Sequence, residues 1–158
     1  MQVSVRAAAA AGLAVATAQL LGLQFPLYAL IAAILVTDLV PARTSQLAVP
    51  RLAGTILGAT LGAVISVVFK SWPYVGPLMI AVGVMAAVFL THVLGMKDAA
   101  KVAGYVCGVV LLNHTDGPWR YAAYRLIETI VGITIAVMVS FVPKLLKADK
   151  FNEQQLRG

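Results

Sequence analysis

The sequence predicts an all-α integral membrane protein: six transmembrane helices arranged as a 3+3 inverted repeat. Three observations lead to this fold class. Hydrophobic residues form 61% of the 158-residue chain and charged residues only 11%, against about 45–50% and about 25% in soluble domains. Six apolar stretches alternate with short polar ones, and a motif in the third stretch recurs in the sixth. With a mean hydropathy of +0.92, much of the apolar surface is expected to face lipid.

Each apolar stretch has roughly the length of a membrane span, for which about 20 residues are needed. The stretches lie at about 5–22, 25–40, 52–69, 75–95, 99–113 and 119–142. Between the second and third, the polar segment from Arg43 to Pro50 is expected to be a loop. The segment from Asn113 to Pro118 is dense in turn residues and is expected to be another. The transmembrane domain is therefore expected at 1–143, followed by a short polar tail at 144–158.

Basic residues gather on one predicted side of the membrane. Six spans place both termini on the same side, together with nine of the twelve lysines and arginines. Cytoplasmic segments carry this excess in membrane proteins, so we expect cytoplasmic N and C termini, in a bacterial plasma membrane. The same distribution accounts for the net charge of +6 and predicts no nucleic-acid partner.

Two ten-residue stretches, 51–60 and 125–134, share Arg, Leu, Thr, Ile, Gly and Thr at a constant offset of 74. Each is predicted to open the third helix of a three-helix half. Because three is an odd number, the second half is expected upside down, a common plan for transporters. Chance similarity between two apolar helices is the alternative.

The second helices of both halves are short, and each ends in polar residues. Thr37 and Asp38 end the first, and Asn113 and His114 end the second. Paired short segments in matching positions point to a substrate pathway. Upright helices with polar ends in the interface would show the same pattern.

Arg51 and Arg125 are candidate anion-binding residues. Ionised groups at membrane depth face the bundle interior, pair up or line water. Arginine can bind a carboxylate through two parallel N–H donors. Glu128 lies one turn from Arg125, either as a structural ion-pair partner or as a group that tunes or gates an anion site. Arg51 has Gly54 at the corresponding position, and its candidate partner is Asp38. The candidate substrate-binding residues are Arg51, Arg125, Glu128, Asp38 and Asn113.

Small residues recur at four-residue spacing on three of the predicted helices, which lets neighbouring backbones approach closely in lipid. The candidate packing positions are Gly54, Gly58, Gly62, Gly104, Gly108 and Gly132. The pattern fits packing within the bundle and packing between subunits equally well.

The sequence gives no support for an enzymatic function. There is no nucleophile with a plausible base, no pair of carboxylates and no glycine-rich phosphate loop. Two isolated histidines and one cysteine do not make a zinc site. We therefore expect no catalytic residues, no metal and no cofactor.

The stretch from Tyr28 to Ala63, with its Arg-x-x-Gly-Thr-x-x-Gly motif, resembles the signature region of the fusaric acid resistance and aromatic acid exporter proteins. The plant aluminium-activated malate channels resemble the same domain. The likeness covers about residues 5–143, and the final helix matches at Arg125, Thr129 and Gly132. It implies export of aromatic or other organic acids, or passive anion conduction, by subunits that pair into dimers. Many relatives add a second domain, so a bare six-helix unit is expected to dimerise to build a complete pathway.

The first functional hypothesis is a transporter or channel for small organic anions, aromatic ones among them, that acts as a homo-oligomer, with a dimer favoured. Its expected partners are membrane lipids, further copies of the chain and the anion. The alternative is a structural or accessory subunit of a larger membrane complex, which the small size and the glycine-rich helix faces motivate.

Overall fold

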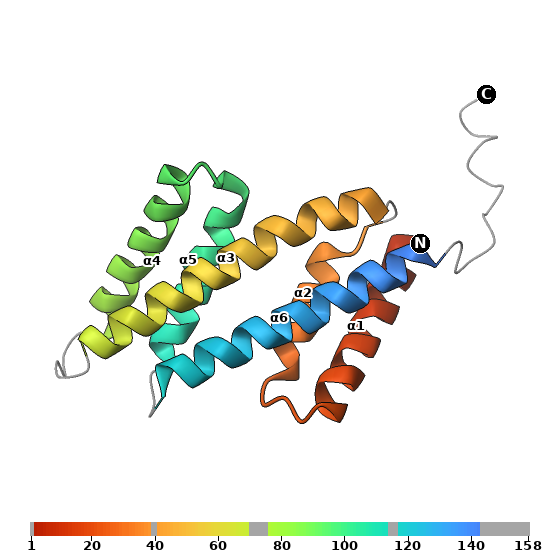
Figure 1. Ribbon diagram of the computed structural model, residues 1–158, viewed down its shortest axis with the longest axis horizontal. Helices are drawn as coiled ribbons and strands as arrows, with labels where there is room; N and C mark the ends of the chain where they lie inside the picture. The colour runs from red at the N-terminus through yellow and green to blue at the C-terminus, as the bar shows by residue number, and fades with distance from the viewer. Residues whose placement is uncertain (1, 39–40, 70–75, 114–116, 143–158) are drawn as a thin grey trace.

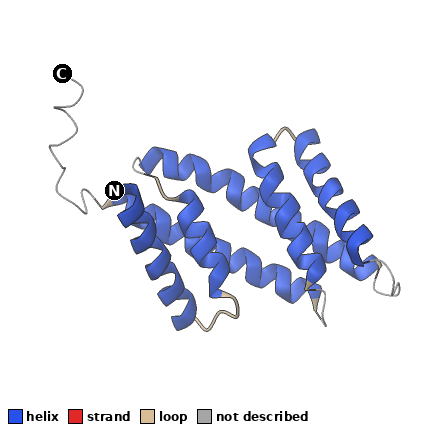
Figure 2. Cartoon of the chain, turned by 180° about the vertical axis from the view of Figure 1, so that it is seen from behind, coloured by secondary structure: helices blue, strands red, loops and turns tan. Residues whose placement is uncertain are grey.

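Six α-helices and one 3-10 turn form the computed structural model, which describes residues 2–38, 41–69, 76–113 and 117–142 (Figure 1). No strand occurs in these ranges, and Figure 2 shows the helices with their short connections from behind. The predicted tail at 144–158 and His114 lie outside the described residues. The elements are α1 (Gln2–Leu20), α2 (Pro26–Val36), α3 (Pro41–Val68), α4 (Gly76–Val93), η1 (Lys97–Ala99), α5 (Ala100–Leu112) and α6 (Pro118–Phe141).

Each predicted apolar stretch overlaps a helix, but the expectation of six full spans needs correction. Within the described residues, four helices are long and apolar enough to cross a membrane: α1, α3, α4 and α6. Helices α2 and α5 have 11 and 13 residues. At about 1.5 Å per residue they measure about 17 Å and about 20 Å, against a hydrocarbon core of about 30 Å. The two short second helices therefore stop well inside the thickness of a membrane.

Helix α3 begins much earlier than expected, because the polar segment after Pro41 is helical and not a loop. Proline suits the first turn of a helix, and Pro50 inside the helix is of a kind that membrane helices tolerate. Arg51 consequently lies in the third turn of α3 instead of opening it. Arg125 likewise lies two turns inside α6, which starts at Pro118.

Helices α3 and α6 are the two longest helices of the fold and pack against each other. Helices α4 and α5 pack against α3, while α1 and α2 pack against α6 (Figure 1). The last helix of the second half therefore lies with the first two helices of the first half. Buried alanines fill both groups, among them Ala14 and Ala33 in the group with α6, and Ala63 and Ala103 in the group with α3.

The helices alternate in direction along the chain (Figure 1). The starts of α1, α3 and α5 and the ends of α2, α4 and α6 lie at one end of the bundle, here called the termini end. The opposite ends of these helices lie at the other, far end. An even number of alternating helices leads to this arrangement.

The candidate packing glycines bring helices of the same chain close together. A side chain at Gly58 would collide with the backbone of Ala103 on α5, and one at Gly132 would collide with the backbone of Ala29 on α2. Gly54 and Gly62 also face α5, whereas Gly104 and Gly108 face α4. The glycines on α3 and α6 thus hold the two short helices against the two long ones, and Gly104 and Gly108 let α4 approach α5.

We expect Gly58→Ala and Gly132→Ala to lower the free energy of unfolding by about 1–3 kcal/mol each, the usual effect of overpacking a tight contact. Gly12→Ala is the matched control, because nothing lies within 4 Å of an added methyl group there. Thermal unfolding of the three purified variants in detergent measures the difference. Equal midpoints for all three would contradict the proposed close helix contacts.

Candidate functional site

Two arginine side chains from different helices meet at one tyrosine ring. The guanidinium carbon of Arg51 on α3 lies 5.1 Å from the ring centre of Tyr105 on α5, and that of Arg125 on α6 lies 5.9 Å from the same centre. Both arginines are buried, with exposed fractions of 5% and 2%. The negative face of an aromatic ring attracts a guanidinium by about 0.5–2 kcal/mol, so Tyr105 is a shared support for both charges.

Arg125 has a second aromatic contact, with α2. Its guanidinium carbon lies 3.2 Å from the ring centre of Tyr28. Arg125 therefore touches rings from both short helices. Neither Tyr28 nor Tyr105 was expected at the site from the sequence; the available signal was a polar-tipped aromatic residue inside each short apolar helix.

Several polar atoms of this site have no hydrogen-bond partner among the described residues. They are Nε of Arg51, Nε and Nη2 of Arg125, and Oε2 of Glu128, all buried. An unsatisfied buried polar group costs about 1–3 kcal/mol, and more when it is charged. The two guanidinium groups therefore retain donors that an anion can use.

Glu128 is fully buried and caps the start of α2. Its Oε1 accepts a hydrogen bond of 2.8 Å from the backbone N–H of Phe25, which is the N-cap residue of α2. The positive end of a helix dipole favours a carboxylate at this place. Glu128 forms no ion pair with Arg125 in the described part of the chain. The geometry therefore differs from the structural ion pair that the one-turn spacing suggested.

Three aromatic rings pack on the far side of Arg125. The hydroxyl groups of Tyr28 and Tyr121 lie 2.9 Å apart and share a hydrogen bond. The ring of Phe25 meets that of Tyr121 edge-on at 5.3 Å and that of Tyr28 at 6.1 Å. Phe25, Tyr28 and Tyr121, here called the aromatic plug, join the start of α2 to α6.

A hollow of about 510 Å³ opens at the termini end and reaches Arg51. Cationic side chains from α3, η1 and α5 surround it, with apolar side chains from α2 and α3 between them. We call it the basic hollow; its lining comprises Leu35, Val36, Arg43, Gln46, Leu47, Pro50, Arg51, Lys97, Asp98, Lys101 and Val102.

A smaller hollow of about 310 Å³ lies at the far end, where α2 and α6 start and α5 ends. Asn113 belongs to it, and its side-chain amide donates to the carbonyl of Val109 at 2.9 Å. We call it the aromatic hollow; its lining comprises Gln24, Phe25, Asn113, Gly117, Arg120, Tyr121 and Tyr124. The lining stops at the aromatic plug and does not include Arg125.

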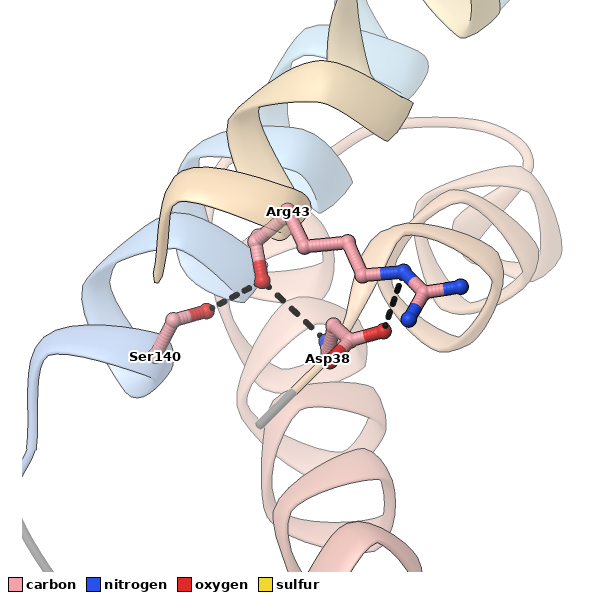
Figure 3. A network of polar contacts seen from close by, with 4 residues as sticks. Asp38, Arg43 and Ser140 are labelled. Atoms are coloured by element: carbon pink, nitrogen blue, oxygen red, sulfur yellow. Dashed lines mark hydrogen bonds and ion pairs between the residues drawn. The ribbon is translucent and has the colours of Figure 1, made fainter. Parts of the chain in front are cut away.

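Asp38 makes no ion pair with the two buried arginines and lies beside Arg43, which lines the basic hollow. Its Oδ2 is 3.4 Å from Nε of Arg43, so the ion pair it forms is with Arg43 and not with the expected Arg51 (Figure 3). The hydroxyl of Thr44 accepts hydrogen bonds from the backbone N–H of Asp38 at 3.1 Å and from the hydroxyl of Ser140 at 2.9 Å. This network fastens the start of α3 to the end of α6.

Comparison with known proteins gives one family. The family model described as fusaric acid resistance protein-like matches residues 13–139, a range that contains both buried arginines and the aromatic plug. No curated protein and no solved structure matches the chain.

We expect Glu128→Leu to destabilise the protein by about 1–3 kcal/mol, because the N–H of Phe25 would lose its buried acceptor. Glu128→Gln keeps a side-chain oxygen and is expected to cost clearly less. Thermal unfolding of the two variants in detergent compares them. If the leucine variant were as stable as the glutamine variant, the capping role of Glu128 would be wrong.

Proposed function

Because this chain belongs to the fusaric acid resistance protein-like family, whose members are membrane transporters, we propose that it moves small organic anions, aromatic acids among them, across a membrane. One observation carries the choice of an anion. Two buried guanidinium groups, on Arg51 and Arg125, keep nitrogen atoms without a hydrogen-bond partner among the described residues.

An organic carboxylate matches these groups in charge and in shape. Charge-assisted hydrogen bonds from arginine to a carboxylate are shorter and stronger than neutral ones. The rings of Tyr28 and Tyr105 lie beside the same guanidinium groups, and aromatic pairs attract each other beyond simple burial. Aromatic or other apolar bodies attached to the carboxylate therefore have a surface to pack on.

The basic hollow is the proposed entrance at the termini end. Arg43, Lys97 and Lys101 line it together with Arg51. The lining also contains one acid, Asp98, so positive charge is in excess, which raises the local concentration of anions. From Arg51 the next positive group is Arg125, and Tyr105 lies within 5.1 Å and 5.9 Å of the two guanidinium carbons. We propose that the anion passes from one arginine to the other along this ring.

The inverted repeat is part of the proposal, and contacts at the offset of 74 support it. Gly58 on α3 packs on Ala103 of α5. The residues 74 positions away, Gly132 and Ala29, pack in the same way. The Thr55 hydroxyl donates to the carbonyl of Arg51 at 2.9 Å. At the matching place on α6, 74 positions later, the Thr129 hydroxyl donates to the carbonyl of Arg125 at 2.8 Å.

We further propose cytoplasmic termini and a homo-oligomer, with a dimer favoured. The excess of basic residues at the termini end supports the orientation. Helix α4 supports the oligomer, because only 17% of its span is buried inside the chain and a row of large apolar side chains follows its outer face. The row consists of Leu78, Val82, Met85, Phe89 and Val93.

We expect Arg51→Gln and Arg125→Gln each to reduce anion flux by about tenfold or more, since losing a hydrogen bond to a charged group costs about 1.5–3 kcal/mol. The assay is uptake of benzoate and malate into proteoliposomes that contain only this chain. Arg43→Gln is the matched control. Its exposed charge already faces Asp38, and exposed charges are screened, so its flux should fall by less than about threefold.

Unchanged flux in both buried-arginine variants would show that the site is elsewhere. If the unmodified, folded chain carried no anion at all, the accessory-subunit hypothesis would replace the transporter. Purification in mild detergent would then be expected to retain other membrane proteins.

A further inference from the structure

We infer that the aromatic plug of Phe25, Tyr28 and Tyr121 is a gate, and that this structure is open at the termini end and closed at the far end. The inference rests on the proposed function for what passes the gate. The position of the gate follows from the two hollows and the contacts between them.

The two hollows are related to each other by the offset of 74, and residues from both halves of the chain line each of them. Four positions on α3 that line the basic hollow correspond, at the offset of 74, to four positions that line the aromatic hollow, three of them on α6 and one at its N-cap. The pairs are Arg43 with Gly117, Gln46 with Arg120, Leu47 with Tyr121, and Pro50 with Tyr124. Asp98 of the basic hollow corresponds in the same way to Gln24 of the aromatic hollow. The two hollows lie at opposite ends of α2: Phe25, at the start of the helix, lines the aromatic hollow, and Val36, its last residue, lines the basic hollow.

The hollows differ in whether they reach their arginine. At the basic hollow the positions that match the two plug tyrosines are Leu47 and Val102. These aliphatic side chains have no polar tip that can hold one to the other, and Arg51 is part of the wall. At the aromatic hollow the tyrosine hydroxyls meet at 2.9 Å, and Arg125 lies behind the ring of Tyr28 at 3.2 Å. The tyrosines therefore separate Arg125 from the far end.

The plug is built so that it can open. It consists of one hydrogen bond between hydroxyl groups and of edge contacts between rings, and both kinds of interaction are individually weak in proteins. Phe25 lies at the N-cap of α2, where the chain enters the helix, and its N–H donates to Glu128. A small turn of the Tyr121 side chain would break both its hydroxyl contact and its contact with Phe25.

The test measures access to Arg51 from each side of the membrane. In a chain whose single cysteine is removed by Cys107→Ser, Arg51→Cys provides one thiol in the wall of the basic hollow. A membrane-impermeant sulfonate thiol reagent is added to right-side-out or to inside-out vesicles, and the labelling rate is measured. The rate from the termini end should be high in every variant, which also shows that the protein is folded.

From the far end, we expect slow labelling that Tyr121→Ala speeds up on the order of tenfold or more, as when a state populated at roughly 0.1–10% becomes the major one. Tyr121→Phe keeps the ring but loses the hydroxyl contact and should give an intermediate rate. Tyr124→Ala is the matched control, because Tyr124 lines the same hollow outside the plug.

Equal labelling of Arg51→Cys from both ends without a plug substitution would overturn the inference. So would the absence of labelling from the termini end, or a Tyr121→Ala rate no higher than that of Tyr124→Ala. Labelling requires no transported anion. A chain that conducts no organic anion can therefore still show the gate, and the two hypotheses fail separately.

Discussion

The burial of two guanidinium charges inside an apolar bundle is the constraint on which the rest of the structure depends. A charge at the centre of a bilayer costs several kcal/mol unless it is paired or reached by water. Here neither Arg51 nor Arg125 forms an ion pair with a carboxylate in the described chain, and aromatic rings support both guanidinium groups. The site therefore keeps its positive charge, which a structural ion pair would have neutralised.

The glycines and the short helices make this arrangement possible. Because Gly58 and Gly132 let backbones touch, α5 and α2 lie close enough to α3 and α6 to bring Tyr105 and Tyr28 to the arginines. Because α2 and α5 end early, each end of the bundle has room for a hollow. The same shortness places the start of α2 beside Glu128, whose carboxylate then binds the helix end. Packing and chemistry thus come from one set of residues.

Hydropathy and the repeated motif were enough to predict the helical class, the approximate helix positions and the two arginines as candidates. The start of α3 was missed because a polar segment with a proline reads as a loop, although its polar side chains face a hollow inside the membrane protein. Tyr28 and Tyr105 were missed for another reason. Helix packing decides which face of a short helix meets an arginine, and the periodicity of a single sequence does not predict that packing. Asp38 was assigned to Arg51, yet the early start of α3 brings Arg43 closer.

The short second helices also determine where a membrane voltage acts. In a membrane, with water filling the two hollows, the potential would fall mainly across the protein between them, a layer about as thick as the length of α2, about 17 Å. This is little more than half of the about 30 Å of a bilayer core, and the field there is correspondingly stronger. One elementary charge that crosses the full potential changes its energy by about 2.3 kcal/mol per 100 mV. An anion that moves from Arg51 past Tyr121 would therefore take up most of this energy over about 17 Å.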